Sequence, residues 1–75
     1  MSEVRIDDNG NRRWYNKKDE LHRVDGSAIE YENGDREWWV NGKLHREDGP
    51  AVEYENGYKK WFLNGNRHRE DKAAV

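Results

Sequence analysis

The stretch EYENGDREWWVNGKLHREDGPAVEYENG, residues 30–57, decides the fold, because most of the chain on either side repeats some part of it. Within it, Asn33-Gly34 separates two segments rich in aromatic and β-branched residues, 28–32 and 35–40. An Asn-Gly pair in that setting predicts a β-hairpin with a two-residue type I′ turn, since both turn residues take positive φ. Turn dipeptides recur about every 8 residues, which leaves no window for three helical turns. The sequence therefore predicts an all-β fold.

The pattern occurs about three times in tandem, at a spacing of 23 to 24 residues. Three features recur in register, and they are Asn9-Gly10, Asn33-Gly34 and Asn56-Gly57, then Trp14, Trp38 and Trp61, then His22, His45 and His68. We place the copies at about 4–27, 28–50 and 51–75, with the last one truncated, in a single domain that covers residues 1–75. Units of this length usually share a core with their neighbours. We expect an antiparallel β-meander and leave open whether each copy holds two or three strands.

The two-residue turn implies a strand register, and the register assigns the sheet faces. If Asn33-Gly34 and Asn41-Gly42 are both tight turns, Ile29 lies opposite Trp38 and Trp38 lies opposite His45. Continuing the same count adds Val52 and then Trp61 to this row. We predict that the row of Trp, His and β-branched side chains is the core face. The other face is aromatic and charged, with Tyr15, Trp39 and Phe62 among Glu30, Glu37, Glu53, Lys60 and Arg67.

Residues 31–57 resemble a variant of the MORN repeat, with a Trp shortly before an Asn-Gly, a His soon after it, and a Tyr-rich strand that ends in another Asn-Gly. The sequence of residues 38–53, WWVNGKLHREDGPAVE, is similar to repeats in small uncharacterised proteins of tailed bacteriophages. The resemblance implies a phage accessory protein in the cytoplasm of a host cell. An Arg replaces the Gly that follows the His in MORN repeats, so lipid binding is not carried over.

Composition narrows the function classes. Charged residues make up 40% of the chain and hydrophobic residues 32%, so the four Trp, four Tyr and one Phe supply most of the apolar area. The absence of Cys fits a reducing compartment. No apolar run approaches the roughly 18 residues of a membrane span, and the 14 basic and 16 acidic residues are interleaved without a basic stripe. We expect a soluble cytoplasmic protein that binds neither membranes nor nucleic acid.

Each of the three repeated histidines is followed by an Asp three residues later. A His and an Asp together could bind a metal ion or act as a general base. Equivalent residues of successive copies lie at least two strand spacings apart, roughly 9 to 10 Å. Ligands of one zinc ion must lie within about 4 Å of one another, so the three histidines cannot share an ion, although a single His and Asp within one copy remain possible. No Cys nucleophile is present, and the only serines are Ser2 and Ser27. We predict structural histidines, no metal, no cofactor and no enzymatic activity.

Two surface features are candidate protein-binding sites. The first is the aromatic row Tyr15, Trp39 and Phe62 with Arg46 and Arg67 as neighbours, since Trp, Tyr and Arg dominate binding hot spots. The alternative is that these rings only cover the second side of a thin sheet. The second feature is the acidic run Glu30, Glu32, Asp35 and Glu37, in which the tight turn would set Glu30 opposite Glu37. This run is either a solvated face or a patch for a basic partner.

We therefore predict a non-catalytic protein-interaction module, which the phage resemblance makes an accessory protein that binds and blocks a host protein, for example a defence component. The alternative is a binder of sugar or nucleotide rings that stack on Trp39 and Phe62. We also expect a homodimer, because the third copy stops at Val75 and would leave the sheet edge beside Trp61 uncovered. A monomer whose sheet curls over its own Trp row is the alternative.

Overall fold

The computed structural model describes residues 3–71 of the chain, and the side chains of residues 3–67. These residues form β-strands and no helix, so none of them forms a helix that could cross a membrane. The strands are β1 (Glu3–Ile6), β2 (Arg12–Tyr15), β3 (Ile29–Glu30), β4 (Arg36–Glu37), β5 (Trp39–Val40), β6 (Lys43–Leu44), β7 (Val52–Glu53), β8 (Lys59–Leu63) and β9 (Asn66–Asp71). The all-β class predicted from the sequence is confirmed.

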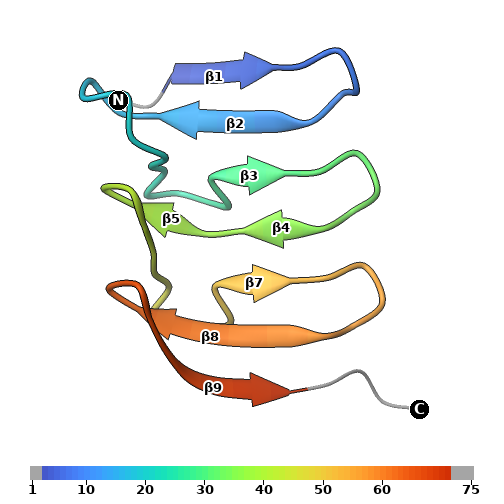
Figure 1. Cartoon of the computed structure of the whole chain (residues 1–75), viewed down its shortest axis with the longest axis vertical. Helices are drawn as coiled ribbons and strands as arrows, with labels where there is room; N and C mark the ends of the chain where they lie inside the picture. Colours follow the sequence, from blue (N-terminus) through green and yellow to red (C-terminus); the bar gives the residue numbers. More distant parts are fainter. Residues whose placement is uncertain (1–2, 72–75) are drawn as a thin grey trace.

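Seven strands form one sheet in the order β1-β2-β3-β4-β7-β8-β9, and every neighbouring pair is antiparallel. The remaining two, β5 and β6, form a hairpin of their own, in which β5 continues the line of β4 beyond Trp38 (Figure 1). The molecule measures 38 × 27 × 16 Å. The seven-stranded sheet is thus the main layer of the molecule, and the β5–β6 hairpin is attached to it at the end of β4.

Two kinds of Asn-Gly turn alternate along the chain. At Asn41-Gly42 both residues have positive φ, 50° and 80°, and they join Val40 directly to its partner Lys43, which is a type I′ turn. Asn64-Gly65 has the same conformation. At Asn33-Gly34, by contrast, only the glycine has positive φ, 103°.

The loop at residues 32–34 therefore has three residues. The Tyr31 N–H donates to the Asp35 carbonyl at 2.9 Å, and the Gly34 N–H donates to the Tyr31 carbonyl at 3.0 Å. This pattern is a type I turn followed by a glycine in the left-handed region. The loop between Tyr54 and Tyr58 repeats both hydrogen bonds.

The longer loop shifts the register by one residue, so the predicted core face is wrong. Ile29 lies opposite Glu37 instead of Trp38, and Val52 lies opposite Lys60 instead of Trp61. A one-residue shift moves every side chain of a strand to the other face. Ile29 and Val52 therefore share a face with Trp39 and Phe62, which we had assigned to the charged side.

Part of the predicted row is confirmed, because Asn41-Gly42 forms the two-residue turn that we expected. The His45 N–H donates to the Trp38 carbonyl at 3.0 Å, so these two residues are cross-strand neighbours. His45 does not lie beside Val52, however, since β7 pairs with β4. The loop that follows His45 carries the chain past its own hairpin to the edge of β4 (Figure 1).

The fully buried residues are few and small. Ala28 and Ala51 are 0% exposed, Ile29 and Val52 are 4% exposed, and Ser27 is 3% exposed. All nine aromatic side chains are only half-buried. The buried residues are thus small or β-branched, whereas we had predicted that the aromatic rings would be the core.

Consecutive copies are joined by two Leu-His-Arg segments, residues 21–23 and 44–46. In the second segment, the Leu44 carbonyl accepts the Gly65 N–H at 2.8 Å, His45 Nδ1 accepts the Asn64 N–H at 3.0 Å, and the Arg46 N–H donates to the Phe62 carbonyl at 3.2 Å. The first segment makes the same three bonds, and its partners are Gly42, Asn41 and Trp39. Each segment therefore connects one copy to the next through backbone and imidazole groups.

The last described strand covers an edge that we had expected to be open. β9 pairs with β8 from Leu63 opposite Asn66 to Lys59 opposite Asp71, with a register irregularity between Trp61 and Phe62. The edge beside Trp61 is thus occupied by the chain itself. His68 is the equivalent of His22 and His45 in the third copy. Its side chain is not among those that the structure describes.

Candidate interaction surface

The arginine of each Leu-His-Arg segment folds back over a tryptophan of its own copy. The Arg23 guanidinium carbon lies 4.0 Å from the Trp14 ring centroid, and that of Arg46 lies 3.9 Å from the Trp38 centroid. A guanidinium at this distance from an indole is held by cation–π attraction. Trp38 is half-buried, and the Arg46 guanidinium covers part of its ring. We call each of these two stacked arginines an arginine lid.

The loop after each arginine fixes the guanidinium. Arg46 Nε donates to Asp48 Oδ1 at 3.1 Å, and Arg46 Nη1 donates to the Pro50 carbonyl at 3.1 Å. Arg23 makes the corresponding bonds to Asp25, at 3.0 Å, and to the Ser27 carbonyl, at 3.2 Å. The spacing Arg-x-Asp-Gly therefore encodes a closed loop around one arginine.

The glycine of this loop leaves room for the arginine. A Cβ atom on Gly49 would lie 2.9 Å from the guanidinium carbon of Arg46, and one on Gly26 would lie 3.1 Å from that of Arg23. Both distances are shorter than a carbon–carbon contact of 3.5 to 4.0 Å. A Cβ at position 49 therefore requires the Arg46 side chain to shift, and one at position 26 requires a smaller shift of Arg23.

The same arginines reach a cross-strand row of alternating charges. Arg12, Glu30, Arg36, Glu53 and Lys59 lie opposite one another in turn across β2, β3, β4, β7 and β8. Arg23 pairs with Glu30 at 3.5 Å, and Arg46 pairs with Glu53 at 3.1 Å. The predicted opposition of Glu30 to Glu37 is wrong, because the three-residue loop sets Glu30 opposite Arg36.

A groove of about 520 Å³ lies between the two arginine loops. It is lined by Arg23, Val24, Asp25, Gly26, Trp38, Val40, His45, Arg46, Glu47 and Asp48. Trp38 and Val40 are half-buried lining residues, whereas Val24 is 81% exposed in the first loop. The groove thus combines an aromatic and aliphatic lining with a solvent-exposed aliphatic side chain.

Acidic groups dominate the accessible charge of the groove. The side chains of Asp25, Glu47 and Asp48 are 80%, 80% and 88% exposed, while those of Arg23 and Arg46 are both 23% exposed. Each arginine is shared between two carboxylates, one in its loop and one on the sheet. An approaching molecule therefore meets carboxylates first, and the guanidiniums are already occupied.

The histidines are used by the fold. Nδ1 of His22 and of His45 accepts a backbone N–H at 3.0 Å, and Nε2 of His45 lies 3.6 Å from the Glu47 carboxylate. Among the residues that the structure describes, no three His, Cys, Asp or Glu side chains gather closely enough to hold a metal ion. The arrangement of His22 and His45 is explained by the connection between copies.

The aromatic row proposed from the sequence lies on the face that carries Ile29 and Val52. The Arg5 guanidinium lies 4.1 Å from the Tyr15 centroid, and Trp39 Nε1 donates to Glu37 at 2.9 Å. Phe62 is half-buried. Ile29 and Val52 on the same face are each 4% exposed. Tyr15 and Trp39 therefore have polar partners within the chain, on a face that also holds the two most buried β-branched residues of the described chain.

The acidic run is largely used within the fold. Glu30 accepts the Ser27 hydroxyl at 3.0 Å, and Asp35 accepts the Glu55 N–H at 2.7 Å. Glu37 accepts the Tyr31 hydroxyl at 3.3 Å, while burial, with the Glu37 charge second, raises the pKa of Tyr31. Glu32 and Arg67 are exposed at the surface, and Arg46 alone among the predicted site residues lines the groove. The structure does not bring the nine predicted residues together in one site.

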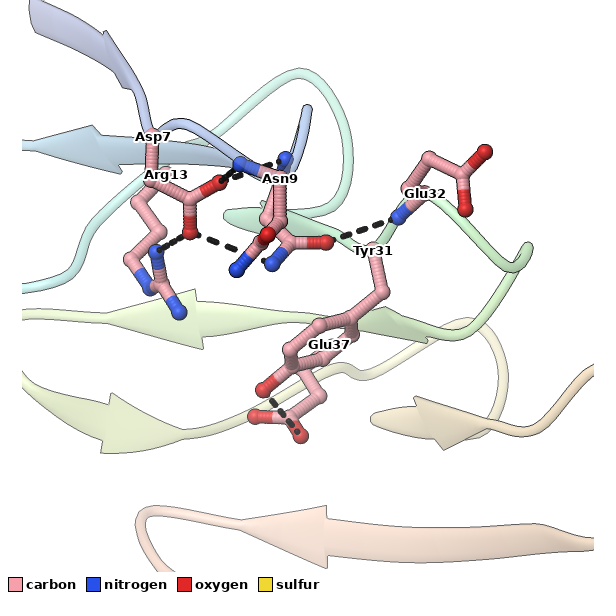
Figure 2. A network of polar contacts seen from close by, with 7 residues as sticks. Asp7, Asn9, Arg13, Tyr31, Glu32 and Glu37 are labelled. Carbon is pink, nitrogen blue, oxygen red and sulfur yellow. Dashed lines mark hydrogen bonds and ion pairs between the residues drawn. The ribbon is translucent and has the colours of Figure 1, made fainter.

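One polar cluster was not anticipated from the sequence. Figure 2 shows Asp7, which accepts the Asn9 N–H at 2.9 Å, the Asn11 N–H at 3.0 Å and Arg13 Nη1 at 3.0 Å. The Arg13 hydrogen bond and then the Asn11 N–H lower the pKa of Asp7 from 3.8 to about 2. Asn11 Oδ1 in turn accepts the Glu32 N–H of the next loop at 2.9 Å (Figure 2). The cluster links the first loop to the second.

No protein-family model, curated protein or solved structure matches the chain. Sequence reasoning had named Arg46 but had missed Val24, Asp25, Glu47 and Asp48, which lie with it in the groove. The sequence did contain a signal for these two loops, since the pattern Arg-x-Asp-Gly occurs at the same place in the first two copies. Asp25 and Asp48 had been interpreted only as turn residues and as carboxylates that follow a His by three positions.

Proposed function

We propose that the chain is a MORN-like tandem-repeat meander that serves as a non-catalytic protein-interaction module, and that it docks a partner protein in the groove between the two arginine loops. The observation that carries the proposal is the composition of the groove. Trp38 and Val40 line it, Val24 is 81% exposed beside them, and the two guanidiniums are paired with carboxylates. Aromatic and aliphatic groups surrounded by charged side chains are typical of the centre and rim of a protein interface.

The charge of the groove indicates what the partner carries. Three exposed carboxylates surround the apolar part, so the complementary surface has an apolar side chain with Lys or Arg around it. The phage resemblance of residues 38–53 makes a bacterial host protein the proposed target, and blocking of that protein the proposed effect. Binding of this kind requires no reacting group in the groove.

Affinity capture with two matched variants tests the proposal. Tagged wild-type protein, Val24→Asp and Leu63→Asp are each incubated with a bacterial lysate, and the retained proteins are compared. Leu63 is a suitable control because it is an exposed apolar residue, 39% exposed, that does not line the groove. We expect a protein that is retained by wild type and by Leu63→Asp but lost with Val24→Asp. Equal retention by all three would place the docking surface elsewhere.

A thermal-shift screen with sugars and nucleotides separates this function from the ring-binding alternative. A ligand present at 100 times its dissociation constant adds about 2.7 kcal/mol to the free energy of unfolding. We expect no shift with any of these compounds. A shift that disappears in Trp39→Ala would favour the aromatic face and contradict the groove.

A further inference from the structure

Among the described residues, β1 is the outermost strand at one end of the sheet (Figure 1). All four of its side chains are exposed, including Val4 at 45% and Ile6 at 63%. In the second copy, the equivalent strand β3 pairs with β2 on one side and with β4 on the other. β1 therefore presents to solvent an edge that the other copies use for pairing, and such an edge can template the addition of another strand.

The backbone groups of Val4 and Ile6 point away from the sheet. The Asp7 N–H donates to the Asn11 carbonyl, which lies on the β2 side. Because backbone groups alternate in direction along an antiparallel strand, those of Arg5 and Glu3 also point toward β2, and those of Val4 and Ile6 point outward. A strand that joins this edge must bond to Val4 and Ile6.

The opposite end of the sheet does not offer the matching partner for this edge. Inside the sheet, the edge of β4 is taken by β7, the first strand of the next copy. The corresponding edge of β8 is taken by β9 over its whole length. A head-to-tail arrangement in which β1 of one molecule continues β8 of another is therefore blocked. Pairing of β1 with the outer edge of β9 would repeat head to tail without closing, whereas β1 with β1 about a two-fold axis closes as a dimer.

Charge selects the register of such a pair. Antiparallel pairing of β1 with itself can centre on Val4, on Arg5 or on Ile6. The register centred on Ile6 sets Val4 opposite Asp8, which lies in the turn beyond β1. It also sets Arg5 opposite Asp7, whose carboxylate already accepts Arg13 and two loop N–H groups. Two registers remain. One sets Arg5 opposite Arg5 and Glu3 opposite Asp7 of the second molecule, so that like charges face each other. The other sets Val4 opposite Val4 and sets Glu3 opposite Arg5 on both sides of the two-fold axis. Opposite charges across a strand pair stabilise it and like charges destabilise it.

We propose that β1 is a self-pairing edge through which two molecules of this chain join in antiparallel register about Val4 to form one continuous sheet. Arg5 already contacts its own Glu3 at 3.0 Å and its own Asp19 at 2.5 Å, and the side chains of Arg5, Glu3 and Asp19 are 51%, 68% and 66% exposed. Pairing places a second Glu3 within the same row. The exposed Val4 side chains meet on the opposite face.

Charge reversal tests the register. Glu3→Arg gives β1 two positive charges, and Arg5→Glu gives it two negative charges. Light scattering behind size exclusion is measured for wild type, for each variant and for their equimolar mixture, from low micromolar concentration upward. We expect wild type to rise from 9.0 kDa to twice that mass, each variant alone to stay at the single-chain mass, and the mixture to reach the doubled mass again.

A backbone variant tests the edge without changing charge. The Val4 N–H points outward, so Val4→Pro keeps the pairing of β1 with β2 but removes the central donor. We expect Val4→Pro to melt close to wild type and to remain at the single-chain mass. A wild type that stays at 9.0 kDa at every concentration, a Val4→Pro that still dimerises, or masses that grow beyond two chains would each overturn the proposal.

Discussion

Arg46 shows how a highly charged chain can cover its tryptophans. Its guanidinium lies on the Trp38 ring, is bonded to Asp48 and the Pro50 carbonyl, and is paired with Glu53. The aliphatic stem of an arginine covers apolar surface while its polar head stays hydrated. The charged residues of this protein therefore contribute to its packing, which a count of hydrophobic residues does not reveal.

The first prediction concerns Gly49. Because a Cβ at this position would lie 2.9 Å from the Arg46 guanidinium carbon, we expect Gly49→Ala to displace the arginine and to cost about 0.5 to 2 kcal/mol, the range of a cation–π contact. Combined with Arg46→Ala, it should add almost nothing further. Denaturant unfolding of the two single variants and the double variant measures this. Fully additive costs would mean that Gly49 acts independently of Arg46.

The second prediction concerns Asp7 and pH. Its pKa is lowered from 3.8 to about 2, so the carboxylate favours the folded state above 3.8, and this contribution is lost as the pH falls toward 2. We expect Asp7→Asn to be less stable than wild type at neutral pH and to lose less stability between these two values. Its exposed neighbour is the matched control, since Asp8→Asn removes a carboxylate but none of the hydrogen bonds of Asp7, and it should be less destabilising at neutral pH. Parallel curves for wild type and Asp7→Asn would contradict the role of Asp7.

At the scale of elements, the Leu-His-Arg segments connect the copies. His22 and His45 each accept, through Nδ1, the N–H of the asparagine in the next type I′ turn. An imidazole nitrogen that accepts a hydrogen bond carries no proton, so in the neutral ring the proton lies on Nε2. The Glu47 carboxylate near Nε2 of His45 favours the same tautomer.

The third prediction follows from this tautomer. In mildly alkaline solution, long-range proton–nitrogen correlation spectra of His22 and His45 should show a protonated Nε2 and an unprotonated Nδ1. Unfolding in denaturant is the control, because the preference should disappear when the connection between copies is lost. A protonated Nδ1 on either ring in the folded protein would show that the bond to the next turn does not form.

The strand class and the positions of the turns could be predicted from Asn-Gly pairs, but the turn length could not. Asn33-Gly34 forms a three-residue loop in which Asn33 Oδ1 accepts the Asp35 N–H at 3.0 Å, whereas Asn41-Gly42 forms a two-residue turn. Both are compatible with the same dipeptide. One residue of difference reverses the face of Ile29, and that reversal accounts for the wrong core assignment.

The site was less accessible to sequence reasoning than the fold. The groove depends on Arg23 and Arg46 folding back over tryptophans nine and eight positions earlier, and on two copies placing their loops side by side. Neither relation is local in sequence. The predicted aromatic and acidic residues were chosen by residue type, and most of them turned out to have partners within the fold.

At the scale of the whole molecule, a seven-stranded sheet with few buried side chains among the described residues supports the surface loops. A chain of this length buries only about 60% of the surface exposed when it is unfolded. Hydrogen bonds between copies and the arginine lids add contacts to the little apolar surface that such a sheet buries. These same lids form the walls of the groove, so the elements that hold the fold together also shape the proposed docking surface.

Site-specific photo-crosslinking tests this proposed docking surface most directly. A photoreactive phenylalanine analogue replaces Val24 in the groove or, as the control, the exposed Asn56 of the β7–β8 loop, which does not line it. After irradiation in bacterial lysate, we predict a discrete protein adduct from position 24 and none from position 56. An adduct at position 56 without one at position 24 would contradict the groove as the docking surface.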